Sequence, residues 1–176
     1  MRKKLPLLGA ALIAMLAGYG LGQFLWMPSE AKPPLGQMTE FVLPDLEGKP
    51  HNIKEWGGNL ILLNFWATWC PPCREEIPFL ITMQQRYGTQ GLKVIGVAID
   101  RAEAVDQYRR SQGINYPILL GGYDAVSLLT QYGNSKQALP YSVIITPQRE
   151  VVARKLGVYA PDELESLIRS FLPKSQ

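Results

Sequence analysis

Two near-continuous apolar runs dominate the hydrophobic pattern of the chain. Residues 60–67 read LILLNFWA, and residues 92–100 read LKVIGVAID. Apolar runs of this length, without alternating polar positions, are typical of strands that are buried on both faces of a sheet. A shorter run at residues 116–120 predicts a further strand. The pattern therefore indicates a sheet with a deeply buried centre.

Helical patterns alternate with these strands. Helices are expected at residues 73–87, 102–112, 124–133 and 161–173. Pro78 is expected to kink the first of them. The last begins with Pro161, carries acidic residues in its first turn and presents an apolar stripe, which are the features of a well-defined amphipathic helix.

Two hairpins complete the pattern. Residues 41–53, FVLPDLEGKPHNI, predict two short strands around a turn at residues 46–48. Residues 141–157 predict a second pair of strands around a turn at residues 148–150. Strands that alternate with helices indicate an α/β protein, with a mixed sheet flanked by helices on both faces.

The N-terminal region predicts attachment to a membrane. Arg2, Lys3 and Lys4 precede residues 5–27, which contain no charged side chain. About 20 apolar residues suffice to cross a bilayer, and the basic residues are expected on the cytoplasmic side. A cleaved signal peptide is the alternative, but its candidate cleavage region, residues 18–22, lies inside the apolar run. We therefore expect an uncleaved anchor, with the rest of the chain across the membrane.

Length and charge limit the remaining possibilities. We expect an anchor at residues 1–27, a linker at 28–38 and one domain at 39–176. Three of the 18 basic residues precede the apolar run, and the other 15 balance the 15 acidic ones. A neutral body without a basic run gives no electrostatic reason to expect nucleic-acid binding.

The candidate chemistry lies in the only two cysteines, Cys70 and Cys73. They follow a predicted strand and stand where a helix begins. Helix N-termini present unpaired N–H groups and about half a positive charge, both of which stabilise a thiolate. The short spacing lets the second thiol attack a mixed disulfide formed by the first. We expect Cys70 to be the nucleophile and Cys73 the resolving thiol.

Other uses of a cysteine pair fit less well. A zinc site needs four ligands, and the chain has one histidine, His51, on the first hairpin, which we expect to be a surface residue. A purely structural disulfide between Cys70 and Cys73 would close a very small loop and constrain the unfolded chain little. Two thiolates could hold Cu(I), so a redox-inert copper carrier or chaperone stays an alternative. The main expectation is a redox-active disulfide without a metal or other cofactor.

The cysteine motif and its surroundings resemble a known family. The stretch NFWATWCPPCREEIP, with the preceding FVLPDLEGK hairpin and the Leu139–Pro140 pair before a strand, is similar to the membrane-anchored thioredoxin-like reductases of the TlpA/ResA/DsbE group. The resemblance covers residues 39–172. It implies a thioredoxin fold with an N-terminal β-hairpin and a central insert around the helix after Asp100.

The same resemblance implies a function outside the cytoplasm. Proteins of this group exchange thiols and disulfides with protein substrates on the periplasmic side of the cytoplasmic membrane. Apocytochrome c, before haem attachment, is often the substrate. A membrane thiol-reducing transporter supplies the electrons.

The resemblance also assigns roles to particular residues. Pro140 is expected to follow a cis bond and to face the cysteines, which leaves the Leu139 backbone free to pair with an extended substrate. An ordinary trans turn is the alternative. Glu76, one helical turn after Cys73, matches an active-site glutamate and could accept the proton of the resolving thiol. Alternatively, Glu75 and Glu76 are both solvated acids at a helix start.

The motif predicts further contacts around the cysteines. Trp69 is the more exposed candidate for substrate contact, whereas Trp66 belongs to the strand. Pro71 and Pro72 are expected to contact substrate, and because they lack an N–H group the thiolate of Cys70 gains fewer donors. This favours a reductant over a strong oxidant.

Asn64 bears on the acid–base chemistry of the cysteine pair. Asn64 stands where cytoplasmic thioredoxins have a buried aspartate, and an amide cannot accept and release a proton, which strengthens the case for Glu76.

The main enzymatic alternative is a thiol peroxidase of the peroxiredoxin type. Its motif requires proline and threonine at the positions that Leu63 and Ala67 occupy, and Thr68 is one place away.

Overall fold

The computed structural model describes residues 35–122 and 124–172. The anchor predicted at residues 1–27 lies outside these ranges, as does most of the predicted linker. No helix within the described ranges is long and apolar enough to cross a membrane.

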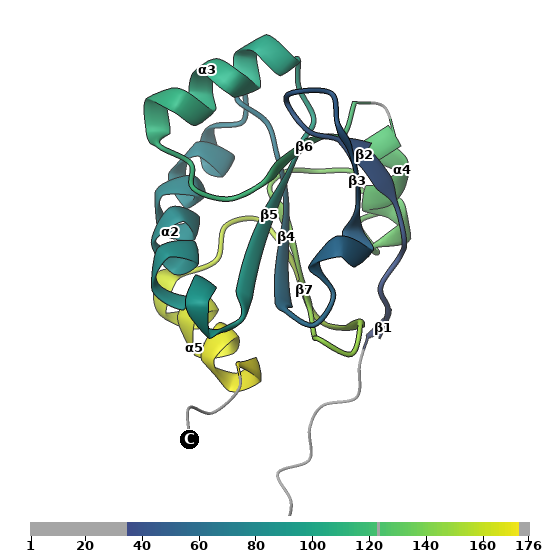
Figure 1. Ribbon diagram of the computed structural model, residues 1–176, viewed down its shortest axis with the longest axis vertical. Coiled ribbons are helices and arrows are strands. Elements are labelled where there is room, and N and C mark those ends of the chain that lie inside the picture. Colours follow the sequence, from purple (N-terminus) through teal and green to yellow (C-terminus); the bar gives the residue numbers. More distant parts are fainter. Residues whose placement is uncertain (1–34, 123, 173–176) are drawn as a thin grey trace, which may run out of the picture. The chain divides into compact units, whose positions relative to one another are not determined.

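A six-stranded mixed sheet forms the centre of the domain (Figure 1). Its strands are, in spatial order, β1 (Gly36–Gln37), β8 (Glu150–Leu156), β7 (Tyr141–Ile145), β4 (Leu60–Trp66), β5 (Leu92–Ala98) and β6 (Ile118–Leu120). Strand β4 pairs in parallel with β5 and antiparallel with β7. All seven of its residues are buried, as the apolar run predicts.

Helices cover both faces of the sheet, which confirms the predicted architecture. Helices α2 (Pro71–Tyr87), α3 (Ala102–Gln112) and α5 (Pro161–Phe171) contribute to one apolar cluster, which includes Leu62 and Trp66 of β4. Helix α4 (Asp124–Gln131) contributes to a second cluster with Leu63 and Phe65. Successive side chains of a strand point to opposite faces, so β4 serves both clusters.

The predicted N-terminal hairpin forms a separate two-stranded sheet. It consists of β2 (Val42–Pro44) and β3 (Pro50–Asn52), followed by the 3-10 helix η1 (Ile53–Trp56). A single backbone bridge between Asp45 and Leu119 connects the hairpin to β6. The hairpin therefore lies at the edge of the main sheet.

Two details differ from the sequence prediction. Helix α2 begins at Pro71 instead of residue 73, because proline is well suited to the first position of a helix. The helix runs through Pro78, as expected, and the kink at this residue stays a prediction. Strand β1 lies inside the predicted linker, since Leu35 and Met38 donate backbone hydrogen bonds to β8 and to the turn before it.

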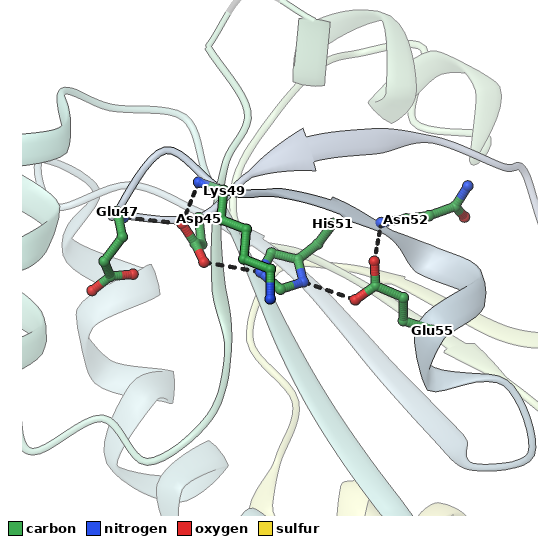
Figure 2. Close-up of polar contacts among 6 residues, drawn as sticks. All are labelled: Asp45, Glu47, Lys49, His51, Asn52 and Glu55. Atoms are coloured by element: carbon green, nitrogen blue, oxygen red, sulfur yellow. Dashed lines mark hydrogen bonds and ion pairs between the residues drawn. The ribbon is translucent and has the colours of Figure 1, made fainter.

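His51 is less isolated than the sequence suggested, and the interpretation of a plain surface residue was wrong. Its Nδ1 lies 2.8 Å from Glu55 Oε2 and its Nε2 lies 2.9 Å from Asp45 Oδ2 (Figure 2). Its side chain is 18% exposed. Hydrogen bonding to Glu55 and to Asp45 raises the pKa of His51. Both ring nitrogens can donate only in the imidazolium form, so the cluster is fully bonded only when His51 is charged.

This cluster should make the stability of the protein depend on pH. The folded pKa of His51 is raised, so its contribution is complete below the unfolded value of about 6.5 and is lost as the pH rises through the folded value. Urea unfolding of the oxidised protein, in which no thiol titrates, should therefore show a free energy that declines over this window.

Replacement His51→Gln should make that decline shallower by the share of the single histidine, whereas Glu76, whose folded pKa is also raised, contributes equally in both proteins. Proton NMR of the single imidazole would give its pKa directly. Equal slopes for both proteins, or an imidazole that titrates at its ordinary pKa, would contradict the prediction.

Candidate active site

The two cysteines lie where strand β4 passes into helix α2. Cys70 occupies the N-cap position, and its Sγ accepts a hydrogen bond from the backbone N–H of Cys73 at 3.3 Å. Pro71 and Pro72 fill the first two helical positions and have no N–H to donate. The N-cap sulfur therefore accepts one hydrogen bond from the helix start, whereas the first three helical residues of a helix without prolines would each offer an N–H donor.

Cys70 and Cys73 form a disulfide. Their sulfurs are 2.05 Å apart and their Cα atoms 5.3 Å apart. In this oxidised state Cys70 is 5% exposed and Cys73 is 1% exposed. The small remaining exposure is thus greater at Cys70, the residue that we expect to be the nucleophile.

Asp100 fixes the loop that precedes the disulfide. Thr68 donates to Asp100 Oδ2 from its backbone N–H, at 3.0 Å, and from its hydroxyl. Burial raises the pKa of Asp100, but the hydrogen bonds from Thr68 and the Arg101 amide outweigh it, so the pKa lies below its usual value. The sequence analysis did not assign a role to Asp100; its position at the end of a buried strand was the available signal.

Of the residues expected to contact substrate, Trp69, Pro71 and Pro72 adjoin the cysteines in sequence, and all three are exposed. Trp69 is 64% exposed. The Leu139–Pro140 bond is cis, as the resemblance implies. Leu139 packs against the apolar cluster that contains both cysteines, and Pro140 is buried. Their contact with substrate stays a prediction.

Glu76 is buried in the protein interior and Glu75 is exposed. The Glu76 carboxylate accepts one hydrogen bond at each oxygen, from the Asn64 side chain at 3.0 Å and from the Tyr159 backbone N–H at 3.2 Å. Burial raises the pKa of Glu76, and these two hydrogen bonds offset only part of the rise. A buried carboxyl group one turn after Cys73 has the properties of a proton acceptor for the resolving thiol.

Asn64 connects Glu76 to a residue that the sequence analysis missed. Its Nδ2 also donates to Ser142 Oγ at 2.9 Å. Ser142 belongs to β7 and is completely buried. A polar residue within an otherwise apolar strand was the only signal for it in the sequence.

Comparison with known proteins agrees with this geometry. A family model described as the AhpC/TSA family matches residues 35–154. The thiol-disulfide oxidoreductase ResA of Geobacillus thermodenitrificans is 30% identical over 135 residues, which are 76% of this chain and 75% of that protein. The chain belongs to the AhpC/TSA family, among its ResA-like thiol–disulfide oxidoreductases.

Other relatives extend the similarity to almost the whole chain. ResA of Bacillus thuringiensis (strain Al Hakam) is 28% identical over 176 residues, which are 97% of this chain and 99% of that protein. The crystal structure of a thioredoxin-family thiol:disulfide interchange protein from Chlorobium tepidum has a TM-score of 0.72 and 26% identity, and covers 81% of this chain and 99% of that one. The thioredoxin-like fold is therefore confirmed.

The geometry predicts which cysteine of this ResA-like chain reacts first. Cys70 is the more exposed cysteine, and its sulfur accepts the Cys73 N–H, which stabilises its thiolate. Limiting iodoacetamide on the reduced protein should therefore modify Cys70 before Cys73, as peptide mass spectrometry would show. In urea the two should react at similar rates. Preferential labelling of Cys73 in the folded protein would reverse the assignment.

Proposed function

We propose that this chain reduces disulfides of protein substrates on the extracytoplasmic side of the cytoplasmic membrane, with Cys70 and Cys73 as its redox pair. The observation that carries the proposal is a disulfide at the start of α2 with a buried carboxyl group, Glu76, one turn further on. The pair itself supplies the redox chemistry, and the proposal needs no other cofactor.

The reaction consists of two exchanges. The Cys70 thiolate attacks one sulfur of the substrate disulfide, and the other substrate sulfur leaves as a thiolate that takes a proton from solvent. Cys73 then transfers its proton to Glu76 and attacks Cys70 Sγ, which releases the second substrate thiolate. The substrate has gained two electrons, and the Cys70–Cys73 disulfide has formed. A dithiol donor reverses these steps to regenerate the enzyme.

The start of α2 supports a reducing role. Thiolate stabilisation makes a dithiol a weaker reductant, because it favours the reduced form of the enzyme. Pro71 and Pro72 withhold two backbone donors, and Cys73 supplies the one hydrogen bond from the helix start to the N-cap sulfur. A pKa of Cys70 near that of a strong oxidant, about 3.5, would contradict the reducing role.

The proposed substrates and partners follow from the family. Apocytochrome c, with its pair of haem-attachment cysteines, fits a reductase of exposed protein disulfides, and a membrane thiol-reducing transporter would supply the electrons. The apolar segment at residues 5–27 supports attachment to the membrane.

A peroxidase is disfavoured by the residues around Cys70. Leu63 and Ala67 occupy the positions where the peroxidase motif needs proline and threonine, and both are buried apolar residues. Thr68, the nearest threonine, is bonded to Asp100 through both its hydroxyl and its backbone N–H. Among the described residues before Cys70, the proline and threonine of the peroxidase motif are therefore replaced by apolar side chains.

Glu76 and its exposed neighbour provide a matched test of proton transfer. Glu76→Gln keeps the size of the side chain but removes the proton acceptor, so resolution of a mixed disulfide at neutral pH should slow by about a hundredfold. Glu75→Gln, which changes the same charge in solvent, should leave the rate unchanged. Stopped-flow measurement with a Cys70-linked model peptide would give both rates. Equal rates in the two variants would show that Glu76 is not the acceptor.

The anchor should be dispensable for chemistry. A variant that begins at Leu35 keeps strand β1 and its pairing with β8, so it should fold and reduce insulin disulfides with dithiothreitol as donor. The same variant with Cys73→Ala should instead accumulate a mixed disulfide between Cys70 and its substrate.

A copper carrier is the alternative function for the cysteine pair. A reduced protein that binds Cu(I) tightly but does not reduce insulin would favour it.

The anchor should nevertheless be needed in the cell, because it confines the active site near membrane-bound donors and acceptors and raises their effective concentration. Exported as a soluble protein at matched abundance, the Leu35 variant should complement a deletion strain poorly, whereas the full chain should complement it fully. Full complementation by the soluble variant would show that the N-terminal segment acts only as an export signal.

A further inference from the structure

Three buried polar side chains, from β7, β4 and α2, form a continuous chain of hydrogen bonds. Asn64 Nδ2 lies 2.9 Å from Ser142 Oγ and 3.0 Å from Glu76 Oε2. The exposed fractions of Ser142, Asn64 and Glu76 are 0%, 1% and 2%. Because these groups have little access to water, each depends on the others for hydrogen bonding.

The sheet fixes the outer member of this chain. Ser142 and Asn64 are direct cross-strand partners in the pairing of β7 with β4. Asn64 has two amide hydrogens, and Ser142 accepts one while Glu76 accepts the other. By accepting the first hydrogen, Ser142 holds the amide plane in the orientation that aims the second at Glu76.

The hydroxyl group of Ser142 is what performs this role. It accepts a hydrogen bond from the Asn64 amide, which neither an alanine nor a valine at position 142 could do.

We propose that Ser142 and Asn64 are positioning residues for Glu76, which hold one amide hydrogen of Asn64 on the Glu76 carboxylate and thereby set how readily its carboxyl group takes up a proton. The functional meaning of this inference rests on the proposed role of Glu76 as proton acceptor.

Other groups also act on Glu76. The Tyr159 N–H donates a hydrogen bond to Glu76 Oε1, and the positive charge of Lys155 favours the carboxylate form. The negative charge of Glu76 in turn raises the pKa of the buried phenols of Tyr116 and Tyr159. Cys73 precedes Glu76 by one turn on α2. None of these groups changes when Ser142 is replaced, so a change in the titration of Glu76 reports on the Ser142–Asn64 pair.

Loss of the hydroxyl should favour the acid form. With Ser142→Ala the Asn64 amide is no longer held in its orientation, which weakens its hydrogen bond to Glu76. A hydrogen bond to an ionised group is stronger than one to a neutral group, so this loss destabilises mainly the carboxylate form. The pKa of Glu76 should therefore rise, by about one unit for one lost hydrogen bond.

The test uses Ser142→Thr and Ser142→Val, which have the same shape and differ in the hydroxyl. Carbon-13 NMR of the glutamate carboxyl groups in the oxidised protein, with Glu76→Gln for assignment, gives the pKa of Glu76 without turnover. The Thr variant should titrate like the wild type, and the Ala and Val variants about one unit higher. The pH profile for resolution of the mixed disulfide should move by the same amount.

Two outcomes separate this inference from the function. Equal pKa values in the Thr and Val variants would overturn the role of the hydroxyl, whatever the enzyme does. A normal rate for Glu76→Gln, together with a higher pKa in Val than in Thr, would overturn Glu76 as proton acceptor and leave the hydrogen-bond arrangement established.

Discussion

Strand β4 is buried along its whole length between two apolar layers, and this burial constrains every polar group on it. Asn64, near the middle of the strand, must be satisfied by protein atoms, because an unpaired amide in an apolar interior costs several kcal/mol. Ser142 and Glu76 supply those atoms. A single amide in the central strand thus determines where a helix carboxylate and a neighbouring hydroxyl must lie.

The first two turns of α2 combine a cysteine thiolate that has few hydrogen-bond donors with a buried carboxyl group. The prolines leave Cys70 with one backbone donor from the helix start, so the thiolate is stabilised less than at a helix start without prolines. One turn later, burial makes Glu76 a better base than an exposed glutamate. In the proposed reaction, the thiol that loses its proton, Cys73, precedes by one helical turn the carboxyl group proposed to receive it.

The sequence predicts best those features that repeat along the chain. Apolar runs locate β4 and β5, and Pro161 marks the start of α5. Spacing along a helix distinguishes Glu76 from Glu75 only when the buried face is known, so the family resemblance was needed to choose between them.

Features that depend on partners far away in the sequence cannot be predicted from local patterns. Ser142 bonds to a residue 78 positions away, and nothing in its own strand names that partner. Strand β1 is too short to have a pattern. His51 is different, because Glu55 completes a capping box with Asn52, and this local signal could have indicated an acid beside the histidine.

The short outer strands of the sheet also affect how long the protein survives. Long, flat sheet edges template pairing with other chains, and here the edge strands are β1, with two residues, and β6, with three. Strand β1 pairs with β8 only at Glu150 and Val151, so within the described ranges the rest of β8 is already an open edge. Arg154 and Lys155 lie on that open stretch, and charged side chains on an edge strand discourage pairing with another chain. The solubility of the domain therefore depends on these two charges more than on the short strand beside them.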